Sequence, residues 1–397
     1  MKKNLSIITL FIIAFFCFKK VAAQNDTLIK TPVYKIGIFS PLYLDSVFSN
    51  NSFKYKQGIP RFILPALDFV QGTQVAMDSI HLKNENIETT IYDSKAFEQN
   101  IPWLIQNKKL DSLNLIIGNV KEAEYKQLAE FAIQKKIPFI SSTYPNDGGI
   151  TANPYVVIVN PTLKAHCEII YSYLLQNHGT DKIFLCRQNG KQEDMVAEFF
   201  KQINEQDGST LLKIETLNFE QTVNIDFLKS KLDSNRKNII VGASLDETFV
   251  TKLADACFKL QITYPITLIG MPNWDGMPGL HKKESYPNFP IFFTSPYFNN
   301  KWDDYSKMLI SAYTKKYKGK PSDMAFKGFE LMYLFTELLT RYPGNLMDNL
   351  NDRSIKIFNE YNFLPVRLKK ENEVPDYFEN KHLYFIKILK GVVSKAW

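Results

Sequence analysis

Apolar and polar positions between Leu113 and Pro145 follow two different periods. Residues 115–118 and 137–140 are apolar runs, and the segment between them places apolar side chains at i, i+3, i+4 and i+7. Those helical positions are Tyr125, Leu128, Ala129 and Ala132. The pattern predicts strand, helix, strand. Both strands lack a polar face, so they belong in a parallel sheet that is covered on both sides.

The same alternation of strands and helices continues on both sides of this segment. It predicts an α/β fold with two doubly wound parallel-sheet lobes. The first lobe begins with strand 35–40, helix 66–80, strand 88–93 and helix 96–109. The second begins with strand 155–159; its further helices are 163–176, 191–206, 226–234 and 247–260, and its further strands are 182–187, 211–217, 238–242, 266–269 and 291–295.

Two proline pairs interrupt this alternation and are suited to crossings between the lobes. They are Asn160-Pro161 and Pro296-Tyr297, the second of which follows a Pro-, Gly- and aromatic-rich loop over 271–290. After it, the pattern predicts helices 303–317 and 322–341, then strands 362–367 and 382–389 as a terminal hairpin, with a turn at Lys390-Gly391.

The first 23 residues have the three-part layout of a secretory signal peptide. Lys2-Lys3 precedes an apolar core over 5–18, and small residues end at Ala23. The apolar run is too short to span a bilayer, which requires roughly 20 residues. We therefore expect a cleavable signal peptide over 1–23, export, and a mature chain that begins at Gln24; an uncleaved anchor is the alternative.

The charge of the chain argues against nucleic acid as a partner. The formal net charge is +7, and four lysines lie in residues 1–23 with no acidic residue, so the mature chain carries 7 − 4 = +3. It has no long basic run or arginine cluster. This near-neutral balance supports neither nucleic acid nor a polybasic contact with a membrane.

Three cysteines remain after residue 23, namely Cys167, Cys186 and Cys257. They are scattered through predicted helices and a strand and are odd in number, unlike the even sets of disulfide frameworks. We expect three buried small apolar side chains; one disulfide beside one free thiol is the alternative.

The order of these segments resembles the type I periplasmic binding proteins, which include the receptors for branched-chain amino acids. The resemblance is carried by KIGIFSPL at 35–42, VAMDSI at 75–80, IYDSK at 91–95, LIIGN at 115–119, IPFISS at 137–142, IFFTSPYF at 291–298 and ENKHLYFIKILKG at 379–391. It spans nearly all of the mature chain. It implies two lobes joined by a hinge of three crossovers, with lobe 1 over 33–154 plus 298–350 and lobe 2 over 155–297 plus 351–397.

The resemblance also implies a function and partners. It predicts a periplasmic, non-enzymatic receptor that closes two lobes on a small polar ligand, such as an amino acid or a peptide-like solute. The receptor would serve an ABC-type transporter or a sensing system, without a cofactor, as a monomer or weak dimer. In this chain the first ligand loop, Asn119-Val120-Lys121-Glu122, lacks the serines of the amino-acid receptors.

Candidate ligand contacts lie in the loops that follow the strands, because ligands of open α/β sheets bind at the carboxyl ends of strands. They are neutral donors and aromatic faces, which suit a small polar solute. The candidates are Tyr43, Asn119, Ser142, Thr143, Gln188, Asn189, Ser244, Asn273, Trp274 and Tyr297. For each of them the alternative is an ordinary loop group that caps a helix, and Trp274 could equally fill the core of its own lobe.

Enzyme motifs are absent or incomplete. Gly242-Ala243-Ser244-Leu245-Asp246 stands between a strand and a helix, like the nucleophile elbow of serine hydrolases, but the second glycine of that motif is replaced by Asp246. An aspartate here is better explained as a helix cap. The five histidines are dispersed, and neither phosphate-binding nor metal-binding motifs occur.

Two alternatives to the receptor remain at this point. The first is a structural or interaction protein of the cell envelope that keeps the fold and binds no ligand. The second, a serine hydrolase, rests only on the incomplete motif around Ser244.

Overall fold

The computed structural model describes residues 32–396 except 51, 82–85, 207, 221, 283 and 370. Residues 34–397 form one unit by their contacts. The predicted signal peptide lies outside the described residues. Among the helices that are described, none has both the length and the apolar character needed to cross a membrane.

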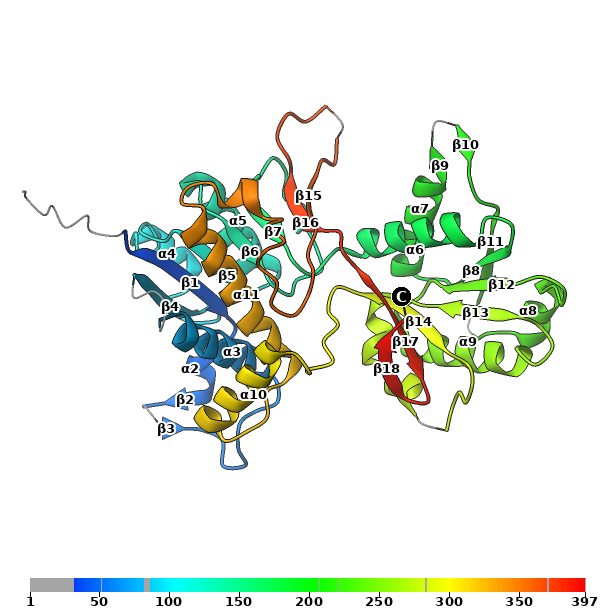
Figure 1. The fold of residues 1–397 in the computed structure, drawn as a ribbon, viewed down its shortest axis with the longest axis horizontal. Helices are drawn as coiled ribbons and strands as arrows, with labels where there is room; N and C mark the ends of the chain where they lie inside the picture. The colour runs from blue at the N-terminus through cyan, green and yellow to red at the C-terminus, as the bar shows by residue number, and fades with distance from the viewer. Residues whose placement is uncertain are drawn as a thin grey trace, which may run out of the picture. The chain divides into compact units, whose positions relative to one another are not determined.

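The first sheet of the described chain has the strand order β15-β16-β7-β6-β5-β1-β4 (Figure 1). Its neighbouring strands are parallel except β15 and β16. The bounds are β1 Tyr34–Ser40, β4 Ile87–Asp93, β5 Leu115–Gly118, β6 Phe139–Ser141, β7 Val156–Ile158, β15 Phe363–Val366 and β16 Tyr377–Asn380. Parallel strands place the carboxyl ends of β1, β5 and β6 at one edge of the sheet.

The two faces of this sheet bury alternate side chains because successive residues of a strand point to opposite sides. Ile36 and Ile38 of β1 pack in one core with helices α3 (Leu64–His81), α10 (Asp304–Tyr317) and α11 (Asp323–Arg341). Phe39 packs in a second core with α4 (Ile101–Gln106) and α5 (Glu122–Lys135). The strands are therefore covered on both faces, as their apolar sequence predicts.

Helices α3 and α11 approach each other closely at two glycines. A Cβ atom on Gly72 would lie 2.0 Å from the carbonyl oxygen of Ala325, and one on Gly328 would lie 2.1 Å from that of Phe69. Both distances are shorter than a carbon–oxygen contact permits. The absence of side chains at these two positions is therefore what allows the two backbones to touch.

The second sheet of the described chain has the order β11-β8-β12-β13-β14-β17-β18. Its first five strands are parallel, and β17 and β18 are antiparallel to their neighbours. The strands are β8 Lys182–Gln188, β11 Ile214–Phe219, β12 Asn238–Gly242, β13 Ile266–Ile269, β14 Ile291–Ser295, β17 Tyr384–Leu389 and β18 Val392–Lys395. Its helices are α6 Leu163–Asn177, α7 Lys191–Asn204, α8 Ile225–Lys231 and α9 Glu247–Leu260.

Short elements complete the described chain. They are α2 Leu44–Val47, β2 Phe48–Ser49, β3 Ser52–Phe53, β9 Glu205–Gln206, β10 Ser209–Thr210 and the 3₁₀ helices η1 Pro272–Gly276, η2 Pro278–His281 and η3 Leu346–Asn349. The two mixed, mainly parallel sheets with flanking helices form two lobes, so the α/β fold class predicted from the sequence is confirmed.

Three strands join a different sheet from the one that the expected boundaries assign them. The ranges 155–297 and 351–397 were expected in lobe 2, but β7, β15 and β16 extend the first sheet. Strand β7 pairs with β6, and β16 pairs with β7. Strand β7 is as apolar as strands of either sheet, and β15 and β16 have only four residues each, so their sequences alone do not select a partner.

The carboxyl-terminal pairing also differs from the expected hairpin. Strand β15 pairs with β16, whereas β17 pairs with β14 and with β18. The turn predicted at Lys390-Gly391 does join β17 to β18, with positive φ at both residues. The predicted strand 382–389 therefore begins at Tyr384 and forms its hairpin with a strand further along the chain.

The helix expected over 96–109 is shorter in the structure. The side chain of Asn100 accepts a hydrogen bond from the backbone N–H of Trp103 and so caps α4, which starts at Ile101. Lys108 has a φ of 56°, in the left-handed region, and this conformation prevents the helix from continuing. The capping asparagine, rather than the apolar pattern, decides where the helix begins.

All three described cysteines are free thiols within the core of the second sheet. Cys167, Cys186 and Cys257 have no exposed surface, and burial raises the pKa of each thiol well above its ordinary value. This confirms the interpretation of these residues as buried small apolar side chains.

Candidate functional site

A cavity of about 310 Å³ lies at the carboxyl ends of β1, β5 and β6. Its walls are mainly apolar and include prolines, Val120 and Met324. Its polar and aromatic lining residues are Tyr43, Ser94, Lys95, Asn119, Lys121, Glu124, Thr143 and Tyr144. Three of these eight, Tyr43, Asn119 and Thr143, were predicted from their places after strands.

A chain of hydrogen bonds connects the ends of three strands beside this cavity. The Thr143 hydroxyl donates to Oδ1 of Asn119 at 2.6 Å, and Nδ2 of Asn119 donates to the Ser40 hydroxyl at 3.2 Å. Ser40 in turn donates to the carbonyl of Ala66 in α3. Asn119 is buried and Thr143 is half-buried. Asn119 therefore holds the Thr143 side chain in place, and the hydroxyl oxygen of Thr143 keeps free acceptor capacity.

Asp93 positions the loop that carries Tyr43. Its carboxylate accepts hydrogen bonds from the backbone N–H groups of Leu42, Tyr43 and Leu44, at 2.7–3.1 Å, and from that of Lys95 at 2.9 Å. Tyr43 has a φ of 52°, a left-handed conformation that a non-glycine residue adopts only when its surroundings hold it. One carboxylate at the end of β4 thus fixes both Tyr43 and Lys95 at the rim of the cavity.

Two opposite charges meet inside the cavity. Nζ of Lys95 lies 2.5 Å from Oε1 of Glu124, with side chains 32% and 17% exposed. The hydrogen bond to Glu124 raises the pKa of Lys95 against the opposing effect of burial. Since Lys95 follows β4 and Glu124 lies in the first turn of α5, the fold rather than local sequence brings the pair together.

A sequence model of the family described as "Periplasmic binding protein" matches residues 66–350. The protein belongs to this family. No curated protein matches the chain.

Solved structures that resemble this periplasmic binding protein share its fold at low sequence identity. A putative branched-chain amino acid ABC transporter protein of Rhodospirillum rubrum is 12% identical with a TM-score of 0.63, over 92% of this chain and 100% of the other. An ABC transporter substrate-binding protein of Desulfitobacterium hafniense, in complex with Leu, is 15% identical with a TM-score of 0.54, over 91% and 99%. The branched-chain amino acid transporter substrate-binding protein of Streptococcus pneumoniae, in complex with isoleucine, is 16% identical with a TM-score of 0.51, over 92% and 100%.

These comparisons establish the fold and the general class of this binding protein. The type I periplasmic binding fold is confirmed, and the family consists of binding proteins rather than enzymes. Asp246 caps α9 by accepting a hydrogen bond from the backbone N–H of Phe249, which is the cap that its sequence predicts. At these identities the likeness concerns the fold and leaves the ligand open.

Ser142 and Tyr297 lie outside the cavity of this binding protein. The Ser142 side chain is fully buried, and its hydroxyl has no hydrogen-bond partner among the described residues. Its carbonyl accepts a hydrogen bond from the Tyr297 hydroxyl at 3.1 Å. Both residues follow β6, which ends at Ser141, but only Thr143 lines the cavity.

The candidates from the second sheet divide into buried and exposed residues. Trp274 is fully buried and donates from Nε1 to the carbonyl of Ser244 at 3.0 Å, and Ser244 is itself buried against Glu193. Trp274 therefore fills the core, which is the alternative that its sequence left open. Gln188 is half-buried, and Asn189 and Asn273 are exposed.

Sequence reasoning overlooked Lys95 and Glu124. Lys95 stands two residues after the end of β4, which is the same signal that selected Asn119 after β5. The sequence analysis selected neutral donors and aromatic side chains as candidates, so it left out the charged Lys95. In the described part of the chain no cluster of three His, Cys, Asp or Glu residues could hold a metal ion.

Proposed function

We propose that this periplasmic binding protein is a receptor for a small zwitterionic solute, an amino acid or a peptide-like molecule. The solute binds in the cavity at the carboxyl ends of β1, β5 and β6, and the protein delivers it to an ABC-type transporter or a sensing system. Membership of the binding-protein family supports the general role. The complexes of structural relatives with Leu and with isoleucine support the ligand class.

The ion pair inside the cavity is the observation that carries this proposal. A zwitterion brings one carboxylate and one ammonium group, which complement Lys95 and Glu124 respectively. Thr143 lines the same cavity as this pair, and apolar wall residues such as Val120 and Met324 accommodate an apolar side chain. A volume of about 310 Å³ is at the small end of ligand cavities, as an amino acid requires.

Residues of the second lobe complete the proposed site when the two lobes close on the ligand. Gln188 and Asn189 stand at or after the carboxyl end of β8, and Asn273 lies in η1 after β13. Their polar side chains suit contacts with the polar ligand groups. Ser142, Ser244 and Trp274 are left out of the site because they are buried.

Export is part of the proposal. The first 23 residues act as a cleavable signal peptide, and the mature receptor acts in the periplasm. Mass spectrometry of protein isolated from the cell envelope tests this point: a mature amino terminus at Gln24 is expected, and an intact Met1 contradicts cleavage.

Thermal unfolding with a panel of amino acids, dipeptides and sugars tests the ligand class. A ligand that binds only the folded state at 100 times its Kd stabilises that state by about 2.7 kcal/mol. Zwitterions are expected to raise the melting temperature, whereas their N-acetyl and amide derivatives are not, since these lack one of the two charges. A panel without any shift favours the structural or interaction protein, and a shift with sugars alone contradicts the zwitterion.

A further inference from the structure

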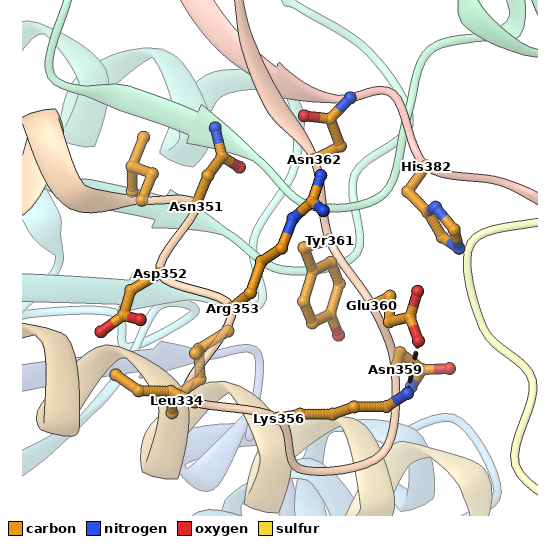
Figure 2. Close-up of a pocket in the computed structure, with 12 residues that line it drawn as sticks. Leu334, Asn351, Asp352, Arg353, Lys356, Asn359, Glu360, Tyr361, Asn362 and His382 are labelled. Atoms are coloured by element: carbon orange, nitrogen blue, oxygen red, sulfur yellow. Dashed lines mark hydrogen bonds and ion pairs between the residues drawn. The ribbon is translucent and has the colours of Figure 1, made fainter.

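A second cavity, of about 420 Å³, lies along the loop between η3 and β15 (Figure 2). It shares no lining residue with the cavity at the carboxyl ends of β1, β5 and β6. Most of its lining comes from residues 350–362, and His382 joins it from the connection between β16 and β17. Its lining is rich in charged and amide side chains, unlike the mainly apolar wall of the first cavity.

The frame of this cavity is fixed by buried hydrogen bonds. Glu330 of α11 is buried and accepts hydrogen bonds from the side chains of Asn359 and Tyr361 and from the backbone of Asn359. Asn351 exchanges two hydrogen bonds with the backbone of Phe363, at 2.7 and 2.9 Å. Both ends of the loop are therefore anchored, which reduces the entropy that a ligand would have to remove on binding.

The acidic groups of the cavity are already occupied. Asp352 accepts hydrogen bonds from Arg341 at 2.8 Å and from Tyr342 at 3.0 Å. Hydrogen bonds from the side chain and the backbone of Ser354, together with smaller effects of Tyr342 and Arg341, lower the pKa of Asp352 to about 2. Glu360 pairs with Lys356. The carboxylates are neutralised by these partners, so they do not oppose an anion in the cavity.

Three polar groups of the lining remain for a ligand. Nε2 of His382 is buried without a hydrogen-bond partner among the described residues. The Arg353 side chain is exposed and the Asn362 side chain is half-buried, and neither makes a side-chain hydrogen bond or ion pair with a described residue. Figure 2 shows the Arg353 side chain extended along the cavity toward Asn362. The uncompensated charge of the cavity is therefore that of Arg353, accompanied by an amide donor and an imidazole nitrogen.

We infer that this cavity is a second binding site, for a small molecule that carries a carboxylate or phosphate group. The planar guanidinium of Arg353 binds two oxygens of such a group at once, a geometry that a lysine cannot supply. Asn362 donates a hydrogen bond to the same group. The ligand also supplies a hydrogen-bond partner for the buried Nε2 of His382. Because His382 lies on a connection between the two sheets, a ligand here contacts both the first lobe and a segment that leads to the second.

Calorimetry of the full chain with inorganic phosphate and, separately, with succinate tests the site, at constant ionic strength maintained with chloride. Saturable binding of one molecule per chain is expected for at least one probe. Binding of phosphate alone identifies a phosphate-bearing ligand, and binding of succinate alone a carboxylate. No saturable binding of either probe overturns the proposal.

Two arginine variants locate the binding. Arg353→Gln is expected to weaken it about tenfold or more, because a hydrogen bond to a charged group is lost. The control Arg236→Gln removes the same charge from an exposed arginine beside Thr180 in the second lobe and is expected to leave affinity within about twofold. Equal losses in both variants indicate a general charge effect and overturn the site.

A spectroscopic readout does not depend on any variant. In the wild-type protein, addition of the bound probe should shift the imidazole nitrogen resonances of His382, assigned with a His382→Gln variant. The resonances of His166, which is buried and bonded to Thr294, should stay in place. A bound probe that leaves His382 unchanged contradicts its place in the site.

Discussion

The hydroxyl of Thr143 donates a hydrogen bond of 2.6 Å to Oδ1 of Asn119, although the two residues are 24 positions apart. This contact joins the ends of β6 and β5, neighbouring parallel strands whose loops meet at one edge of the first sheet. Asn119 accepts the hydrogen bond that the hydroxyl donates, so the oxygen of Thr143 can accept a hydrogen bond from a ligand. The proposed site is thus held in place before a ligand arrives.

Replacement of Thr143 by valine should weaken ligand binding about tenfold, because one hydrogen bond to a charged ligand group is lost. The variant keeps the shape of the side chain but leaves Oδ1 of Asn119 without its donor, so stability should fall by about 1 kcal/mol. Calorimetry with the ligand found by the thermal panel, together with urea unfolding, measures both effects.

Ser142→Ala is the matched control for Thr143→Val. It also deletes one hydroxyl, but this hydroxyl is buried and has no partner among the described residues. Affinity should stay unchanged, and stability should stay equal or rise, since the removed group makes no hydrogen bond. A loss of affinity in Ser142→Ala equal to that in Thr143→Val would contradict the assignment of Thr143 alone to the site.

Glu124→Gln should weaken binding of a zwitterion about tenfold or more, because the ammonium group loses its charged partner. Stability should change by less than about 1 kcal/mol, as expected for a partly exposed ion pair. The control is Asp111→Asn, which breaks the ion pair with Lys135, 2.8 Å long and outside the cavity. Similar affinities of both variants for the ligand would show that Glu124 does not contact the ligand.

Gly328→Ala should destabilise the protein by about 3 kcal/mol or more, since the new methyl group would overlap the backbone of α3 and force two helices apart. Chemical unfolding measures the change. Gly276→Ala is the control, because a Cβ atom at Gly276 meets nothing within 4 Å. A stable Gly328→Ala protein would mean that the contact between α3 and α11 is looser than the structure has it.

His166 should make the protein less stable at acid pH. Burial, with a smaller effect from Lys381, lowers its pKa from 6.5 to about 3 in the folded state. Its Nδ1 lies 2.7 Å from the Thr294 hydroxyl. The unfolded chain takes up a proton below pH 6.5 and the folded one does not, so stability falls as pH drops from about 6.5 toward 3.

The size of this effect follows from the two pKa values. Between pH 7 and pH 5 the histidine should cost about 2 kcal/mol of unfolding free energy. Urea unfolding at both pH values, compared with His166→Gln, isolates its contribution, because the variant has no proton to gain. Identical pH dependence of the two proteins would show that His166 does not stay neutral in the folded state.

The alternation of strands and helices was determined by the sequence alone. Apolar runs such as 115–118 have no polar face. This property depends only on neighbouring residues, so it predicts a buried strand without knowledge of the tertiary structure. The placement of Asn119 and Thr143 at a sheet edge follows from the same pattern, because parallel strands end at a common edge.

Strand partners and side-chain directions were decided by the tertiary structure. A short strand such as β7 or β16 can pair with any strand that offers free backbone groups, so its sheet cannot be derived from its own residues. The choice between Ser142 and Thr143 depends on the course of the backbone after β6 ends at Ser141, which the apolar pattern does not determine. The pairing of Lys95 with Glu124 requires the end of β4 and the start of α5 to lie close together. These two segments approach each other only in the folded chain.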